Sequence, residues 1–565
     1  MRYILEKGIG RRSLPRAFAL AAVSAALMAL AVPNELFKHG LAGLGFIALV
    51  PLYFAVLEAG SPRASAFVVG LFGSLQHALS SFWLWFFQDF RFWTLGSTTI
   101  AYFVVYMVLG LYLWLFLCRS GRARPAAFAI LWASFEYLKS NGFLGYPWAL
   151  LPYSLTDALP LLQIADLAGV YGISFVLAAA NAALAELALG IGSWRLGAEA
   201  PGAGLPGFGS PMPAALSPRA RIAYAGLALA LSALSLGYGL SRLAAPIPLV
   251  GSIDAVLVQQ DTDPWVGSEE EGLMANIRLA RQAMEGGAGT GAAETPGGKR
   301  APDIVLFSET SLTRPYAEFR KYYSKHPSTD PLVPFIKGSG IWLFTGAPVV
   351  VDWHTGDATN SVILIDPSGD LVGSYAKIHP VPFAEAIPFW EFAPFRKFIQ
   401  NAVGLESGWV MGTEYAVFEL PTKGGTFRFG APICFEDAFA GVCRNFFLKD
   451  ADLLVNLTDV SWSKTDSAEI QHWAAARFRA IEARRTLVRS TNGGLSCVVG
   501  PYGQVIASLP LFTAASLRCE VPVYREASPT LYIRFGDWFA RSALLLSAVL
   551  FIILGVGEGN KRRKA

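Results

Sequence analysis

Three residues of types that together catalyse acyl transfer follow strand-like runs in the second half of the chain. Glu309 follows the apolar run 304–307, Lys377 follows a predicted hairpin, and Cys434 follows the run 427–433. A carboxylate can accept the proton of a thiol, a lysine can stabilise an oxyanion, and a thiolate can attack a carbonyl carbon. Taken singly, each is more simply a solvated strand end, a surface lysine or a buried cysteine. Their order within one domain predicts a site that forms and breaks a thioester.

A domain that mixes strands with helices is predicted to position these residues, over the segment 244–534. Turn signals at 367–370 and 501–503 each predict a hairpin between neighbouring strands. Helices are predicted at 269–283 and 468–485, the second with its apolar residues on one face. Strands are predicted at 255–260, 304–307, 341–351, 361–365, 427–433, 453–457, 486–490 and 496–499.

The rest of the chain has the composition of a membrane protein. Of 565 residues, 53% are hydrophobic and only 16% are charged, whereas roughly 25% are charged in ordinary globular proteins. Apolar stretches that approach the ~20 residues of a membrane-spanning helix occur at 17–32, 41–57, 64–87, 98–117, 126–138, 161–191, 222–240 and 542–556. The stretch 126–138 could instead be a partial span. The first stretch could be a signal peptide, but the further spans favour a retained helix.

Loop charges predict how these spans are oriented. Basic residues precede the first span, recur in alternate loops and fill 561–564 at the end of the chain. An even number of spans places all of them on one side, which the positive-inside rule makes cytoplasmic. The predicted fold is a polytopic α-helical membrane domain of about eight spans plus an α/β domain. Residues 1–243 would form seven transmembrane helices, 244–534 the outer domain, and 535–565 the last transmembrane helix and a basic cytoplasmic tail.

Charge and cysteine content exclude other functions. A formal net charge of +4 on a chain of this length gives no argument for binding nucleic acid. The five cysteines are too few for a disulfide framework, and none belongs to a Cys–His cluster with the spacing of metal ligands. We therefore expect neither a metal nor a cofactor.

The motifs of both parts resemble those of one family of membrane enzymes. The glutamate, lysine and cysteine match the nitrilase (carbon–nitrogen hydrolase) superfamily in type and order, and the whole chain resembles the bacterial apolipoprotein N-acyltransferase family. The matching segments of the membrane part are 135–138, 145–148 and 169–175. Those of the outer part are 258–260 with Trp265, 381–385, 433–436 and 489–494. The resemblance is specific, because soluble amidases lack the membrane framework.

The resemblance implies an αββα sandwich that faces the periplasm from the bacterial inner membrane, with both chain termini cytoplasmic. It implies that Cys434 holds an acyl chain as a thioester, that Glu309 is the general base and that Lys377 stabilises the oxyanion. The acyl chain would come from a phospholipid. The acceptor would be the α-amino group of a diacylglyceryl-cysteine at the N-terminus of an apolipoprotein, in a ping-pong sequence.

Further site residues are also implied by the resemblance. Glu385 would support the lysine or the proton path, and Glu436 and Trp265 would line the pocket. Two departures from the family pattern lie nearby: Phe435 replaces the tyrosine common after the cysteine, and 458–463 differs from the usual Asn-Asp-x-Trp-Phe-Gly. Both affect the loop beside the nucleophile and leave the three central residues in place.

The expected partners are the phospholipid, the apolipoprotein and the membrane, and a monomer suffices for ping-pong catalysis. Two other interpretations remain open at the level of the sequence. A membrane-tethered amidase or nitrilase would use the same three residues to hydrolyse a small C–N substrate. A catalytically idle scaffold would only bind lipid or lipoprotein, and the intact set of three residues argues against it.

Overall fold

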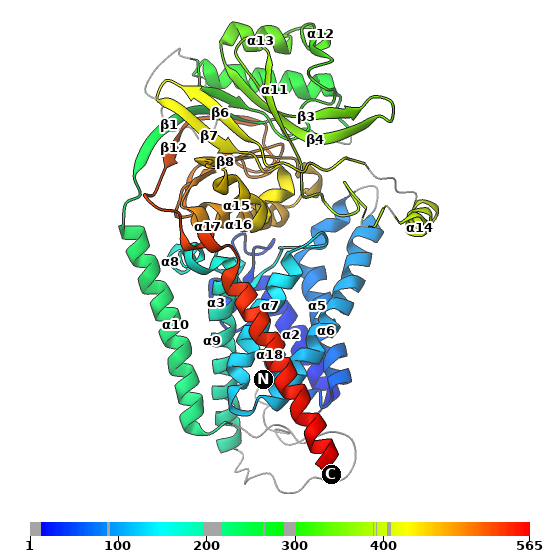
Figure 1. Cartoon of the computed structure of the whole chain (residues 1–565), viewed down its shortest axis with the longest axis vertical. Coiled ribbons are helices and arrows are strands. Elements are labelled where there is room, and N and C mark those ends of the chain that lie inside the picture. Colours follow the sequence, from blue (N-terminus) through cyan, green and yellow to red (C-terminus); the bar gives the residue numbers. More distant parts are fainter. Residues whose placement is uncertain are drawn as a thin grey trace.

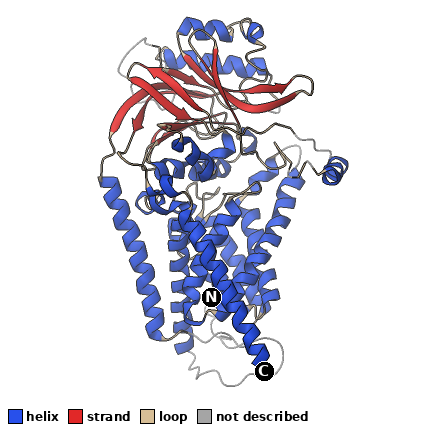
Figure 2. Ribbon diagram, viewed as in Figure 1, coloured by secondary structure: helices blue, strands red, loops and turns tan. Residues whose placement is uncertain are grey.

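The computed structural model of the chain describes residues 13–87, 91–195, 216–263, 266–286, 301–387, 389–390, 392–403 and 408–564. Long helices stand side by side at one end of the molecule, and the strands gather at the other end (Figure 1). Figure 2 shows that the helical end carries no strand among the described residues, so the chain divides into a helical part and an outer α/β part.

The helical part contains segments long and apolar enough to cross a membrane. Its helices are α2 (Leu14–Ala31), α3 (Ala42–Gly45), α4 (Val50–Glu58), α5 (Pro62–Ser80), α6 (Thr98–Arg119), α7 (Arg124–Ser140), α8 (Leu159–Leu162), α9 (Ala165–Arg195), α10 (Pro218–Ala244) and α18 (Trp538–Lys564). Within the described residues, 14–31, 93–119, 165–191 and 218–244 meet both criteria, and 42–58 and 538–554 are shorter apolar helices. The protein is therefore a membrane protein, and the count of eight spans stays a prediction.

One predicted span proves more complicated than a single helix. The stretch 161–191 contains the end of α8 and most of α9, and α9 is interrupted at Gly169, where φ is 66°. A Cβ atom at this position would come within 2.7 Å of the ring of Tyr532. Glycine is therefore required both for the left-handed backbone and for the close approach of the chain segment that leads into α18.

The outer part is built on two six-stranded sheets. The strands are β1 (Leu249–Gln259), β2 (Ile304–Leu306), β3 (Trp342–Asp352), β4 (Asp357–Ile365), β5 (Leu371–Ala376), β6 (Val417–Thr422), β7 (Gly425–Gly430), β8 (Leu453–Thr458), β9 (Thr486–Thr491), β10 (Cys497–Val499), β11 (Val505–Ser508) and β12 (Ala515–Tyr524). Their orders are β12-β1-β2-β3-β4-β5 and β11-β10-β9-β8-β7-β6. Phe344 of the first sheet packs on Phe418 and Phe429 of the second, so the two sheets face each other across a shared core.

Helices cover the outer faces of this sandwich. On the first sheet lie α11 (Glu269–Met284), α12 (Arg320–Tyr323) and α13 (Leu332–Ser339), and on the second lie α15 (Ala440–Leu448) and α16 (Asp466–Ala483). The exposed helix α14 (Ala393–Val403) projects to the side in Figure 1, and the short α17 (Leu531–Phe535) precedes α18. The layers are helix, sheet, sheet and helix.

The predicted strands and the observed strands differ at the sheet edges. All eight predicted strands form, and both predicted hairpins are confirmed, because β5 and β11 pair antiparallel with the strands that precede the two turns. The strands β6 and β12 are absent from the prediction, and they too lie at the ends of the sheets. Edge strands are half exposed and carry polar residues, as in the β12 run Leu517–Val521, which contains an arginine and a glutamate. Their sequences therefore lack the continuous apolar runs of central strands.

Candidate active site

The three central residues of the predicted site converge just beyond strand ends. Glu309 follows β2, Lys377 directly follows β5, and Cys434 begins the 3₁₀ turn η6 (Cys434–Ala438) that follows β7. All three are buried, with exposed fractions of 5%, 1% and 8% respectively. Trp265, the predicted pocket residue, lies outside the described residues.

The ammonium group of Lys377 lies between two carboxylates. Its Nζ atom donates a hydrogen bond to Oε1 of Glu385 at 2.7 Å and lies 3.5 Å from Oε1 of Glu309. Burial acts to lower the pKa of this lysine, but the charges of Glu385 and Glu309 outweigh it and raise the pKa above its usual value. The lysine therefore stays positively charged, as the role predicted for it requires.

Cys434 has a backbone conformation that is rare outside glycine. Its φ is 49°, in the left-handed region. The side-chain amide of Asn456 donates to the carbonyl oxygens of Cys434 and Pro432 at 3.0 and 2.9 Å, which holds the turn on both sides of the nucleophile. Burial and the neighbouring charge of Glu309 raise the pKa of the thiol. The thiol is therefore protonated at rest, and the neighbouring carboxylate of Glu309 can accept its proton.

Two neighbours that the sequence analysis did not single out orient Glu309. The side-chain amide of Asn360 donates to Oε1 of Glu309 at 2.9 Å and to Oε1 of Glu385 at 3.1 Å. The backbone N–H of Asp459 donates to the other oxygen of Glu309 at 2.9 Å. The predicted hairpin at 367–370 could have indicated Asn360, because the pairing of β4 with β5 places Asn360 beside Lys377. The backbone N–H of Lys377 donates to the carbonyl oxygen of Asn360 at 2.8 Å.

Glu436 is fully buried and acts as a brace. Its Oε1 accepts from the backbone N–H groups of Ile378 and His379 at 2.8 Å, and its Oε2 accepts from the N–H of Ile433 at 2.8 Å. The hydroxyl of Tyr375 donates to the same carboxylate. Burial raises the pKa of Glu436 to about 7. The Glu436 side chain therefore connects the segment after Lys377 to Ile433, the residue before Cys434, and stabilises the position of both.

Aromatic side chains connect the site to the helical part. The ring of Phe435 stacks on that of Trp148, with centroids 5.2 Å apart and planes within 15°. Trp148 contacts Trp83, and Trp83 contacts Trp462, at centroid distances of 6.3 and 5.8 Å. Phe87 packs against Trp462 at 5.3 Å. The residue next to the nucleophile therefore lies where the outer part meets the helices, in apolar surroundings that suit an acyl chain.

The geometry supports covalent acyl transfer. A protonated thiol has as its neighbour a carboxylate that is held by two N–H donors, and a cationic lysine lies beside that carboxylate. Attack of the sulfur on a carbonyl carbon would pass its proton to Glu309 and develop a negative oxygen for Lys377 to stabilise. Glu385 holds the lysine in place from its other side.

Comparison with known proteins defines the class to which this site belongs. A family model described as carbon–nitrogen hydrolase matches residues 257–522, which include Glu309, Lys377 and Cys434. A second model, described as apolipoprotein N-acyltransferase N-terminal domain, matches residues 24–183 of the helical part. The outer part is therefore a carbon–nitrogen hydrolase domain with the nitrilase-like α/β fold.

Full-length relatives define the family more narrowly. Apolipoprotein N-acyltransferase 2 of Treponema denticola is 38% identical, over 97% of this chain and 98% of its own. Apolipoprotein N-acyltransferase of Borreliella burgdorferi is 30% identical, over 94% of each chain. Among solved structures, Nit3 of Saccharomyces cerevisiae, a member of branch 10 of the nitrilase superfamily, aligns at 17% identity and a TM-score of 0.34, covering 48% of this chain and 91% of that chain. The chain belongs to the apolipoprotein N-acyltransferase family.

Proposed function

We propose that the protein transfers a fatty acyl chain from a phospholipid to the α-amino group of the diacylglyceryl-cysteine at an apolipoprotein N-terminus, through a thioester on Cys434. The observation that carries this proposal is the stacking of Trp148, from the helical part, on Phe435, the residue next to the nucleophile. An acyl chain held by the helices can reach the sulfur there, in a site from which water is largely excluded.

In the first half-reaction the sulfur of Cys434 attacks the ester carbonyl of the phospholipid. Glu309 takes the thiol proton, and the carbonyl oxygen of the ester becomes an oxyanion beside the ammonium group of Lys377. The bond from the carbonyl carbon to the glycerol oxygen then breaks. Glu309 returns the proton to that oxygen, so a lysophospholipid leaves and the acyl chain remains on the sulfur.

In the second half-reaction the amine of the acceptor attacks the thioester carbonyl. Glu309 takes a proton from the attacking nitrogen while Lys377 again stabilises the oxyanion. The carbon–sulfur bond breaks, and the proton held by Glu309 returns to the departing sulfur. The products are the N-acylated lipoprotein and the resting thiol, which is ready for a further cycle.

The same proposal includes the setting of the reaction. The chain would cross the bacterial inner membrane eight times, place residues 244–534 in the periplasm and keep both termini in the cytoplasm. The direction of the helices supports it, because the loop between α6 and α7 and the end of α18 lie opposite the sheets in Figure 1. A single chain contains Glu309, Lys377 and Cys434, so a monomer would be active.

Intact-mass spectrometry after incubation with phospholipid alone tests the proposal. Wild-type protein should gain the mass of one fatty acyl chain, hydroxylamine should remove it, and a diacylated lipopeptide should accept it. The Cys434→Ser variant should form no adduct that hydroxylamine cleaves as readily as it cleaves a thioester. If no adduct forms and the protein releases ammonia from small amides, it is an amidase instead. If folded protein gives neither an adduct nor ammonia, it is a binding scaffold.

A further inference from the structure

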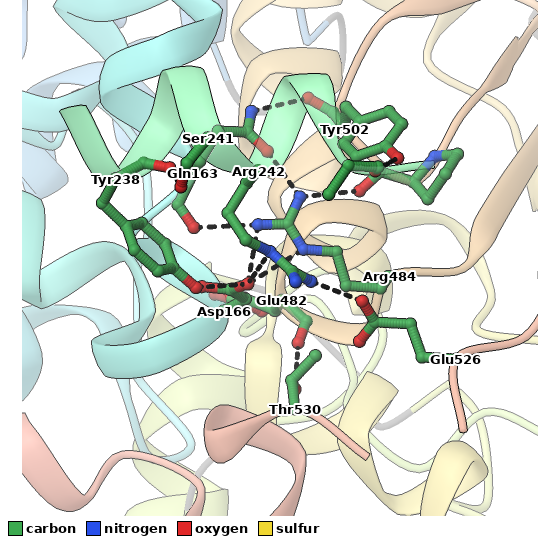
Figure 3. A network of polar contacts seen from close by, with 12 residues as sticks. Gln163, Asp166, Tyr238, Ser241, Arg242, Glu482, Arg484, Tyr502, Glu526 and Thr530 are labelled. Carbon is green, nitrogen blue, oxygen red and sulfur yellow. Dashed lines mark hydrogen bonds and ion pairs between the residues drawn. The ribbon is translucent and has the colours of Figure 1, made fainter. Parts of the chain in front are cut away.

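A buried ion pair joins the outer part to the helical part at a distance from the nucleophile. Arg484, which follows the last residue of α16, is fully buried, and its Nη2 atom lies 2.7 Å from Oδ2 of Asp166 in the first turn of α9 (Figure 3). The Nε atom of the same arginine donates to that carboxylate at 3.0 Å. The remaining donors reach the side-chain and backbone oxygens of Gln163 and the carbonyl of Pro501. Every hydrogen-bonding nitrogen of Arg484 is thus satisfied.

Asp166 is shared with the helix that leads into the outer part. The hydroxyl of Tyr238 donates to it at 2.8 Å, and Nε of Arg242 lies 3.2 Å away, both from the end of α10 (Figure 3). Arg242 also pairs with Glu526, which follows β12. One carboxylate therefore connects α9, α10 and α16, and its two cations compensate its burial.

Other contacts fasten α16 to the helical part along its length. An Nη atom of Arg477 donates to the carbonyl oxygen of Thr156 at 2.7 Å, and the side-chain amide of Gln471 donates to those of Pro33 and Ser80 at 2.8 and 2.9 Å. These anchors, together with the Arg484–Asp166 pair, explain why residues 467–483 are all buried although the sequence predicts only one apolar face. The second face packs on membrane helices and their loops instead of meeting water.

The opposite side of α16 holds the turn that carries the nucleophile. Nε2 of His472 lies 2.7 Å from Oδ1 of Asp437 in η6, and an Nη atom of Arg479 donates to the carbonyl oxygen of Ala438 at 2.9 Å. Nε of Arg489 in β9 donates to the other oxygen of Asp437 at 3.0 Å, so three side chains hold η6. The helix α16 thus links η6 to the helical part by hydrogen bonds, in addition to the direct stacking of Phe435 on Trp148.

We propose that Asp166 and Arg484 are positioning residues that set where Cys434 stands relative to the acyl chain of a membrane-embedded donor. The inference rests on the proposed function. The pair acts through α16: loosening one end of this helix lets η6 shift against the helices while the site itself, held by Asn360, Asn456 and Glu436 within the outer part, stays assembled. Displacement of a reacting group by 1 Å costs on the order of 100-fold in rate.

Comparing the rates of thioester formation from two acyl donors distinguishes a positioning role of Asp166 and Arg484 from a general structural role. Phospholipid in nanodiscs must reach Cys434 from the helices, whereas p-nitrophenyl butyrate is small, water-soluble and independent of the bilayer. In Arg484→Gln, in Asp166→Asn and in the double variant, we expect the rate of thioester formation from phospholipid to fall about tenfold or more. The rate with p-nitrophenyl butyrate should stay within about twofold of wild type. Arg518→Gln is the control, because it removes a less buried ion pair in which two guanidinium nitrogens likewise donate to one carboxylate, that of Asp254, inside the first sheet.

Each outcome decides the inference. An equal loss with both donors would show a general structural role, and no loss with either would show no role; both overturn it. The double variant leaves neither charge of this pair unmatched, so it serves if the single variants do not accumulate. If it too fails to fold while Arg518→Gln folds, the pair is needed for folding and the inference is overturned. Wild-type protein that reacts with the butyrate ester but never with phospholipid would instead contradict the proposed function.

Discussion

At the scale of single residues, the site combines a permanent cation with a resting thiol. Lys377 keeps its charge because two carboxylates lie within 3.5 Å of its ammonium group, although burial alone would favour the neutral amine. Burial and Glu309 keep Cys434 protonated until a substrate carbonyl arrives. A protonated thiol is slow to oxidise and slow to react with alkylating agents, since the thiolate is the reactive form. Proton transfer to Glu309 is therefore part of the attack itself.

Replacement of Glu309 by glutamine tests this assignment. The amide has the shape of the carboxyl group but cannot accept the thiol proton, so thioester formation should fall by about 100-fold to 10,000-fold. Single-turnover intact-mass measurements with phospholipid would report the rate. Glu419→Gln is the control, since that side chain is 69% exposed on β6. A Glu309→Gln protein that acylates at the wild-type rate would show that another group takes the proton.

At the scale of elements, the nucleophile depends on a short turn rather than on a long helix. The turn η6 begins with a residue in the left-handed region, and Asn456 of β8 fixes the carbonyl groups on both sides of it. Left-handed backbone at a residue with a Cβ atom costs free energy, so the surrounding contacts must maintain it. The strand β8 thereby controls the direction in which the thiol of Cys434 points.

Asn456→Ala should weaken this control. The loss of two hydrogen bonds to buried carbonyl groups should lower stability by about 1–3 kcal/mol, and thioester formation should fall by more than the fraction unfolded explains. Thermal unfolding followed by single-turnover acylation of the folded fraction would separate the two effects. A variant that loses stability but acylates normally per folded molecule would show that the turn holds its conformation without Asn456.

The helix α16 gives the outer part a pH-dependent stability. Burial raises the pKa of both Glu469 and Glu482 to about 8, from ordinary values of 4.5 in the unfolded chain. The folded protein therefore keeps protons that the unfolded chain releases. Their stabilising contribution is complete below pH 4.5 and is lost as the pH rises toward about 8.

Glu469→Gln should make this decline less steep. A neutral amide has no proton to lose, so the variant should escape up to about 1.4 kcal/mol of destabilisation per pH unit across that range. Melting temperatures of the purified protein at several pH values between 5 and 8 would measure the difference. Parallel curves for Glu469→Gln, wild type and Glu419→Gln would contradict the assignment.

At the scale of the whole molecule, the nucleophile belongs to the outer part, and the helical part contributes to its surroundings. Trp148 stacks beside the nucleophile, and α16 is buried between the second sheet and the helical part. The outer domain is thus built into the membrane part along an entire helix instead of being tethered by a linker. This arrangement suits a reaction between two substrates that are both embedded in the bilayer.

Membrane-impermeant maleimide labelling tests the proposed orientation. A cysteine introduced at Glu419, in the outer part, should react in intact spheroplasts. A cysteine at Arg122, in the turn between α6 and α7, should react only after the membrane is permeabilised. Labelling is compared with that of the parent protein, which has its own cysteines. The reverse pattern would place residues 244–534 on the cytoplasmic side.

The sequence alone predicted the features that depend on local patterns. Central strands are buried on both faces, so their apolar runs could be read directly, and Glu309, Lys377 and Cys434 were found because each follows such a run or a clear turn. The edge strands β5 and β11 were implied only by the turns that precede them, and β6 and β12 were missed, because half-exposed strands carry mixed residues. Glu385 was recognised through the family motif, and the structure places it against the lysine at 2.7 Å.

Only the tertiary structure decided which distant groups meet. The side-chain amide of Asn360 reaches two carboxylates because of the register in which β4 pairs with its neighbours. Glu436 holds two chain segments together because backbone N–H groups from both donate to its carboxylate. Arg484 and Asp166 lie 318 residues apart. An acidic residue within the predicted span 161–191 is unusual in itself, but nothing in the sequence pairs Asp166 with Arg484. Hydrophobic periodicity specifies which face of an element is buried, whereas the pairing of buried charges depends on how separate elements pack, which no local pattern encodes.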